Sequence, residues 1–141
     1  MKYNEVKKNH LPINKKRTGK KLDFKWITVH NTGNPKSTAA NERAWLTNPE
    51  NETSTGWHIV VDGKEAIEAI PINEIAYHAG TSEGNSTSIG IEICDSAGLT
   101  IILSSQLASN LLQPFKKQLK SIRRRSSFLL TLKQRVRTLR V

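Results

Sequence analysis

A sharp change of composition near residue 97 divides the chain of 141 residues. Residues 1–96 contain 12 lysines and arginines and 12 aspartates and glutamates, so this part carries no net formal charge. Residues 97–141 contain 10 lysines and arginines and no acidic residue, so they carry the whole formal charge of +10. The chain has the length of one domain and is long enough to form a buried core, but its two parts differ in composition.

Composition excludes several classes of protein. The single cysteine, Cys94, rules out an intramolecular disulfide framework. No segment reaches the length of a membrane span, and Met1 to Lys25 is too rich in lysine and polar residues to contain a signal-peptide core. We therefore expect no transmembrane segment and no recognisable signal peptide.

Short β-branched stretches in the first part predict strands. Apolar and polar residues alternate over residues 24–30, and a similar pattern covers residues 89–94. Two further apolar runs, residues 57–61 and 64–70, flank Asp62-Gly63, which is a strong hairpin signal. Residues 71–77 are expected to form a connector with one helical turn, and residues 80–88 a loop.

One helix is expected between the first two strands. Ser37 or Thr38 can cap it, and it runs from Ala39 to about Leu46. The residues expected to face the core are Ala40, Ala44 and Trp45. Strands interleaved with a helix indicate an α/β domain with a mixed central sheet flanked by helices.

Three segments follow from these patterns. Residues 1–22 are interpreted as a basic lead-in, residues 23–98 as the core of the domain, and residues 99–141 as an atypical basic tail. Residues 101–119 have an amphipathic pattern that predicts a helix, although Pro114 interrupts it.

Five polar side chains stand out as candidates for chemistry. His30, His58 and His78 lie near predicted strand ends or loops, whereas His10 lies in the lead-in and is expected to be solvated. Glu92 shares one face of its strand with a glycine and a cysteine, and burying its carboxylate would be costly without a partner. Spacing alone leaves two readings open for the first three histidines: structural side chains or a three-histidine metal site.

Five motifs together resemble one known family. They are residues 27–32, 54–62, 68–71, 76–80 and 88–94, and their order is that of the peptidoglycan amidases of the bacteriophage T7 lysozyme type. This group includes Bacillus prophage endolysins and autolysins. The resemblance implies the T7-lysozyme-like α/β fold and an N-acetylmuramoyl-L-alanine amidase, which cleaves the amide between N-acetylmuramic acid and L-alanine.

The resemblance also implies roles for individual residues. His30 matches the first zinc ligand of the family. Glu92 matches the carboxylate that takes a proton from zinc-bound water as hydroxide attacks the lactyl carbonyl. His58 is expected to support the sheet beside the site. The residues expected to line the substrate groove are Asn31, Tyr77 and His78. This assignment argues against a three-histidine zinc site.

The remaining two ligands of the family, a histidine and then a cysteine or aspartate, should follow about residue 120. Residues 96–141 contain no His, Cys, Asp or Glu. The expected Zn²⁺ site is therefore incomplete in this chain. A change of reading frame near Gly98 explains the altered composition, the missing ligands and the early end together.

Three functions were compatible with these features. The first is a zinc-dependent hydrolase that acts on peptidoglycan at the bacterial cell wall, outside the cell. The second is an inactive remnant that serves at most as a peptidoglycan-binding module. The third, a nucleic-acid binder, is disfavoured because no aromatic residues are interleaved with the basic cluster. That cluster comprises Lys116, Lys117, Lys120, Arg123, Arg124 and Arg125.

Overall fold

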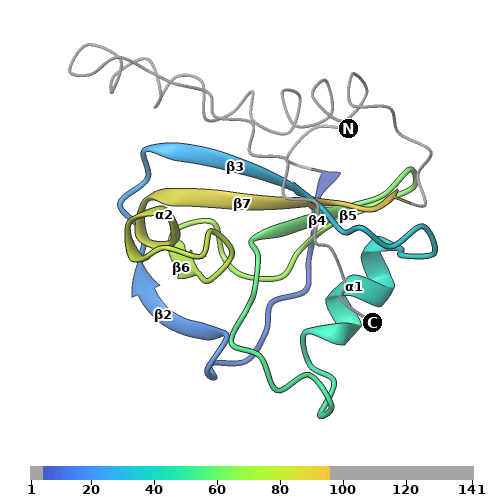
Figure 1. The fold of residues 1–141 in the computed structure, drawn as a ribbon, viewed down its shortest axis with the longest axis horizontal. Coiled ribbons are helices and arrows are strands. Elements are labelled where there is room, and N and C mark those ends of the chain that lie inside the picture. The colour runs from blue at the N-terminus through green and yellow to red at the C-terminus, as the bar shows by residue number, and fades with distance from the viewer. Residues whose placement is uncertain (1–4, 96–141) are drawn as a thin grey trace.

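The computed structural model of the chain describes residues 5–95, in which a five-stranded mixed sheet has the order β1-β5-β4-β7-β3. A two-stranded sheet, β2-β6, lies beside it with helix α2, and helix α1 packs against one face of the larger sheet (Figure 1). The elements are β1 (Lys7–Lys8), β2 (Arg17–Lys21), β3 (Trp26–Asn31), α1 (Ala39–Trp45), β4 (Ile59–Val61), β5 (Ala66–Glu68), β6 (Glu74–Ala76), α2 (Ser82–Thr87) and β7 (Ser88–Ile93). The predicted α/β class with a mixed central sheet is confirmed.

The two strands predicted from alternation, β3 and β7, form the longest pairing of the sheet. They run parallel from the pair Trp26 and Ser88 to the pair Asn31 and Ile93. Strand β4 pairs with the other edge of β7, also parallel, and antiparallel with β5 through the predicted hairpin. Strand β7 thus has a hydrogen-bonded neighbour on each edge, and its three isoleucines are buried on one face of the sheet.

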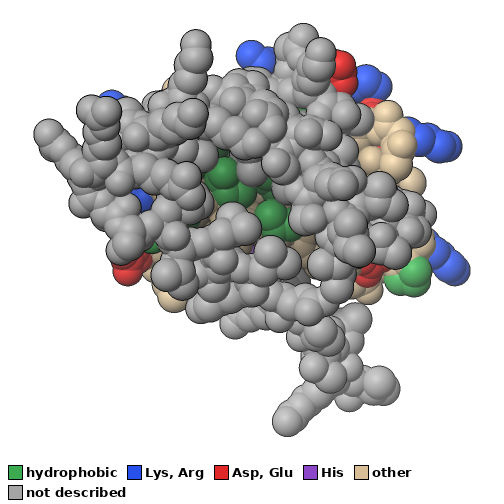
Figure 2. Space-filling view, turned by 90° about the horizontal axis from the view of Figure 1, so that it is seen from above, with side chains coloured by type: hydrophobic (Ala, Val, Ile, Leu, Met, Phe, Trp, Pro, Cys, Tyr) green, Lys and Arg blue, Asp and Glu red, His purple; other side chains and the backbone are tan. Residues whose placement is uncertain are grey.

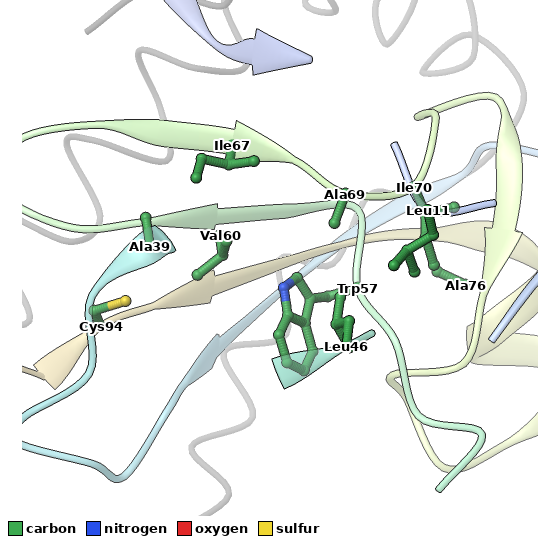
Figure 3. Packing of buried hydrophobic residues seen from close by; sticks show 10 residues of the cluster. All are labelled: Leu11, Ala39, Leu46, Trp57, Val60, Ile67, Ala69, Ile70, Ala76 and Cys94. Atoms are coloured by element: carbon green, nitrogen blue, oxygen red, sulfur yellow. The ribbon is translucent and has the colours of Figure 1, made fainter. Parts of the chain in front are cut away.

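Two apolar clusters lie on the two faces of the sheet. One contains Ile27, Ile59, Val61 and the alternate isoleucines of β7. The other lies between the sheet and α1 and includes Val60 and Cys94 (Figure 3). Adjacent strand residues such as Val60 and Val61 belong to opposite clusters, because successive side chains of a strand point to opposite faces of the sheet. Seen from above, hydrophobic side chains are visible near the centre of this face, and Lys and Arg side chains lie at its margin (Figure 2).

Helix α1 begins where the sequence predicts, but its orientation differs from the prediction. Thr38 is the N-cap, and its hydroxyl accepts a hydrogen bond from the Asn41 N–H at 3.2 Å. The predicted core residues Ala40, Ala44 and Trp45 are exposed. The residues that face the core are Ala39, Arg43 and Leu46. Their spacing of three and four residues also fits a helical face, so the prediction selected the wrong one.

Two short elements replace the predicted connector and loop. Within residues 71–77, Glu74–Ala76 forms strand β6, and within residues 80–88, Ser82–Thr87 forms helix α2. Arg17 of β2 donates to both carboxylate oxygens of Glu74, at 2.8 and 2.7 Å, which holds β2 on β6. The sequence prediction missed both elements because they are too short to show periodicity.

The segment interpreted as a lead-in packs on the domain. Strand β1 adds to the edge of the sheet beside β5, and Leu11 is fully buried. Lys16 is 3% exposed as a whole residue, and its ammonium group donates to the carbonyls of Asn51 and Thr53. The expectation that His10 is solvated is wrong, because its Nε2 lies 2.9 Å from the Glu68 carboxylate. No helix among residues 5–95 is long and apolar enough to span a membrane.

Candidate active site

His30 and Glu92 lie opposite each other at the carboxyl ends of the parallel strands β3 and β7. Because neighbours in register point to the same face, both side chains lie on the face that carries Thr28, Ser88 and Gly90. Both are partly exposed. The carboxyl edge of parallel strands is where ligands of α/β proteins usually bind.

A cleft with a cavity volume of about 450 Å³ opens at this edge. His30 and Glu92 line it together with side chains from α1 and from the segment before β4. The lining residues are His30, Asn31, Thr32, Asn34, Asn41, Glu42, Trp45, Thr55, Trp57, His78 and Glu92. Three residues singled out by the sequence, His30, His78 and Glu92, are thus brought to one cleft, with Asn31 at its rim.

The side chain of Asn31 is held by the turn that follows β3. Its Oδ1 accepts from the Gly33 N–H at 2.7 Å, and its Nδ2 donates to the Asp95 carboxylate. Gly33 has a φ of 64°, a conformation that favours glycine. These bonds fix the rim of the cleft beside His30.

His78 is buried at the base of the cleft, with 9% of its surface exposed. Its Nδ1 lies 3.1 Å from His30 Nε2, and its Nε2 lies 3.1 Å from the Ser88 carbonyl oxygen. Burial, and then the nearby imidazole of His58, lower the pKa of His78 to about 3. His78 is therefore neutral over the physiological pH range.

His58 is fully buried beneath His78. Its Nδ1 accepts from the Gly90 N–H at 2.9 Å, and its Nε2–H donates to the Glu74 carbonyl at 2.8 Å. Burial lowers the pKa of His58 to about 4. The two ring nitrogens thus join β7 to β6.

Tyr77 lies apart from His30. It lines a neighbouring hollow of about 540 Å³ together with Lys20, Ile75 and residues around α2. Thr55 and His78 line both hollows and so form the boundary between them. The groove residues proposed from the resemblance are thus divided between two adjacent depressions.

The side chains around His30 fit only part of a zinc site. Among residues 5–95 no group of three or more His, Cys, Asp or Glu side chains is arranged to hold a metal ion. Residues 96–141 contain none of these four types. A catalytic zinc needs three protein ligands, so the donors of this chain do not complete such a site.

The sequence reasoning missed seven of the eleven residues that line the cleft, and three of them have large side chains. Trp45 and Glu42 lie on α1, and burial raises the pKa of Glu42. Trp57 is 7% exposed and lies close to Leu46 under the cleft (Figure 3). Trp45 is 44% exposed, one of two large hydrophobic side chains exposed among residues 5–95. Assigning Trp45 to the outward face of α1 would have identified it as a site residue, because an exposed tryptophan beside a polar cleft suggests a contact for a ligand.

A protein-family model described as N-acetylmuramoyl-L-alanine amidase matches residues 20–135, well over half of the chain. The chain belongs to this amidase family. The matched range includes the change of composition near residue 97 and continues beyond it. The family similarity therefore extends further than the five motifs.

Individual relatives and solved structures agree with the assignment. The amidase XlyA of Bacillus subtilis is 44% identical over 85 residues, which are 57% of this chain and 28% of XlyA. The amidase CwlA of a Bacillus species is 52% identical over 71 residues, 48% of this chain and 27% of CwlA. The chain thus spans less than a third of the length of either of these two relatives.

The solved catalytic domain of XlyA has a TM-score of 0.70 and 33% identity. The alignment covers 82% of this chain and 77% of that domain. A mutant endolysin from Bacillus subtilis also gives a TM-score of 0.70, with 35% identity and the same coverage of both chains. The part of the chain that the structure describes therefore has the fold of the amidase catalytic domains.

Proposed function

We propose that the cleft binds peptidoglycan at the amide between N-acetylmuramic acid and L-alanine, and that zinc-dependent cleavage of this amide is impaired in this chain. The observation that carries the proposal is the pairing of His30 and Glu92 in one cleft, in a chain that offers no complete set of zinc ligands. The site of action is the bacterial cell wall.

Glu92 is placed to act as a general base. Its carboxylate lies on the strand beside His30 and is partly exposed to the cleft, where a water molecule can reach it. A carboxylate in such a position can accept the proton of a water that attacks the lactyl carbonyl. His30 is the one residue proposed as a zinc ligand, and a single ligand leaves the base without an activated water.

The rest of the cleft is suited to a polar, partly saccharide ligand. Asn31, Asn41 and Thr55 supply amide and hydroxyl groups, and Trp45 supplies an exposed aromatic face. Aromatic side chains of this kind present an apolar body that can cover the faces of sugar rings. Tyr77 extends the lined surface into the adjacent hollow. We infer that binding of peptidoglycan survives without turnover.

The proposal is tested with the full chain and purified peptidoglycan. We expect the protein to sediment with peptidoglycan and to release stem peptides at least about 100-fold more slowly than the XlyA catalytic domain, since the zinc-bound nucleophile is lost. Trp45→Ala should weaken sedimentation. Ile13→Ala is the matched control, because Ile13 is equally a large exposed apolar side chain but lies outside the cleft.

Two results would contradict the proposal. Release of stem peptides at the rate of the XlyA domain would show that cleavage is not impaired. Binding to unrelated DNA without binding to peptidoglycan would favour the nucleic-acid alternative, and that binding should fall with increasing salt.

A further inference from the structure

The second hollow, next to the cleft, is lined by the small β2-β6 sheet, by the segment before β4 and by helix α2 with the residues that precede it. Main-chain hydrogen bonds hold these elements together. The Asp23 N–H donates to the Ser86 carbonyl at 3.0 Å, which joins the end of β2 to α2. The Gly56 N–H donates to the Tyr77 carbonyl at 3.1 Å. A volume of about 540 Å³ is within the usual range of small-ligand sites, roughly 300–1,000 Å³, so the hollow can hold a short peptide.

An irregularity in β2 accounts for the position of Lys20 in this hollow. Between Arg17 and Lys21 the register of β2 against β6 shifts, because four steps along β2 match two steps along β6. Gly19 lies inside this shift and has a φ of 71°, a conformation that favours glycine. Bulges of this kind bend a strand and change the direction of its side chains. Lys20 follows Gly19 directly and lines the hollow.

The two hollows differ in charge. Among the described residues that line the second hollow, Lys20 is the one Lys, Arg, Asp or Glu. It is exposed, and none of the ion pairs among residues 5–95 includes it. The cleft, in contrast, is lined by the acidic side chains of Glu42 and Glu92 and by no described lysine or arginine. Because like charges repel and opposite charges attract, an anionic group is favoured in the second hollow and disfavoured in the cleft.

Asn85 of α2 supplies a second hydrogen-bond donor to the same hollow. Its Oδ1 accepts from the N–H groups of His78 at 3.0 Å and Ala79 at 2.7 Å. Two N–H donors determine which end of the amide is the oxygen, so Nδ2 carries the hydrogens. Since Asn85 lines the hollow, its Nδ2 can donate to a ligand there. A lysine ammonium and an amide N–H are both groups from which a carboxylate accepts hydrogen bonds.

We propose that the second hollow binds a carboxylate of an acidic peptide, and that Lys20 selects this carboxylate over the corresponding uncharged amide. The peptide crosses the boundary formed by Thr55 and His78, which line both hollows. The saccharide joined to its amino end then lies in the cleft beside Trp45, and its carboxylates lie away from Glu92. The difference in charge thus sets the direction of the ligand. This subsite rests on the proposed function, because it takes the peptide part of the ligand that the cleft binds.

A pair of soluble muramyl peptides separates this subsite from the cleft. N-acetylmuramyl-L-alanyl-D-glutamate carries free carboxylates, and its diamide has nearly the same shape without the charge. Each is titrated into the full chain labelled with ¹⁵N, and the dissociation constants are obtained from the changes in chemical shift. We expect the acid to bind about threefold to fivefold more tightly than the diamide at low salt, the effect of an exposed ion pair. This preference should decrease as the salt concentration rises.

Variants of β2 assign the preference to one residue. Lys20→Gln should reduce the affinity for the acid to that for the diamide, whereas Lys20→Arg should keep the preference. Lys21→Gln is the matched control, because Lys21 is the neighbouring exposed lysine but lines neither hollow, and it should keep the preference. Equal binding of acid and diamide to the unmodified chain, or an unaltered preference in Lys20→Gln, would overturn the subsite and leave the proposed function intact. Binding of neither peptide would overturn both.

Discussion

The packing of the buried histidines depends on Gly90, because no larger residue fits beneath the His78 ring. Gly90→Ala should lower the free energy of unfolding by about 2–3 kcal/mol through overpacking. Gly33→Ala is the control: position 33 has open space but a φ of 64°, so only backbone strain of about 1 kcal/mol is expected. Urea unfolding measures both. A cost at position 90 no larger than that at position 33 would contradict this packing.

The buried His58 should make stability depend on pH. Its pKa is about 4 in the folded chain, against 6.5 for an ordinary histidine, so the unfolded chain takes up a proton first as pH falls. The stabilisation is complete above pH 6.5 and is lost as pH falls toward 4, by about 3 kcal/mol in all.

His58→Gln tests this dependence, because an amide can still donate to the Glu74 carbonyl but does not titrate. The variant should be less stable at pH 7.5 and should lose less stability between pH 7 and pH 5. Urea midpoints measured across this range, with circular dichroism as the check of folding, give the comparison. Equal slopes for both proteins would show that His58 is not the group responsible.

At the scale of residues, the sequence predicts the position of His30 and Glu92 but not the contacts of His78. Alternation along β3 and β7 places His30 and Glu92 at strand ends, and the parallel register brings them together. His78 lies 48 residues from His30 along the chain, and their hydrogen bond depends on the path between β6 and β7. No local pattern encodes that path.

Asp62 connects two elements, the β4–β5 hairpin and helix α1. Its Oδ1 accepts from the N–H groups of Lys64 and Glu65, and its Oδ2 accepts from the Ala39 N–H at 2.9 Å. Burial raises the pKa of its carboxyl, but these three backbone hydrogen bonds outweigh it and hold the pKa below its usual value. The helix that carries Trp45 is thus anchored to the sheet.

Asp62→Asn should lower the free energy of unfolding by about 1–3 kcal/mol, because one amide oxygen cannot serve the N–H groups on both sides. Thr38→Ala removes only the side-chain cap of the same helix and should cost about 1 kcal/mol. Urea unfolding compares the two variants. A smaller loss for Asp62→Asn than for Thr38→Ala would contradict the anchoring role.

At the scale of elements, the predictable parts are those with local signals. The Asp-Gly turn predicts the hairpin, and a threonine cap predicts the start of α1. Strand β6 was missed because the Arg17–Glu74 pair, across 57 residues, holds it. Helix α2 was missed because six polar residues show no apolar period. The face of α1 was misjudged because two sets of residues have helical spacing.

At the scale of the molecule, the family and the fold follow from residues 5–95, where one sheet has a buried cluster on each face. The family match continues to residue 135, so composition alone does not mark the end of the resemblance. The predicted helix of residues 101–119 and the basic tail lie outside the described residues. Residues 96–141 cannot supply a side-chain ligand for zinc, because they contain no His, Cys, Asp or Glu.

The most direct test of an impaired zinc site is the zinc content of the purified full chain. After equilibration with zinc and extensive dialysis, elemental mass spectrometry should find well below one zinc per chain, and His30→Ala should change the content little. The XlyA catalytic domain, treated in the same way, is the reference. One tightly held zinc per chain, lost in His30→Ala, would contradict the account.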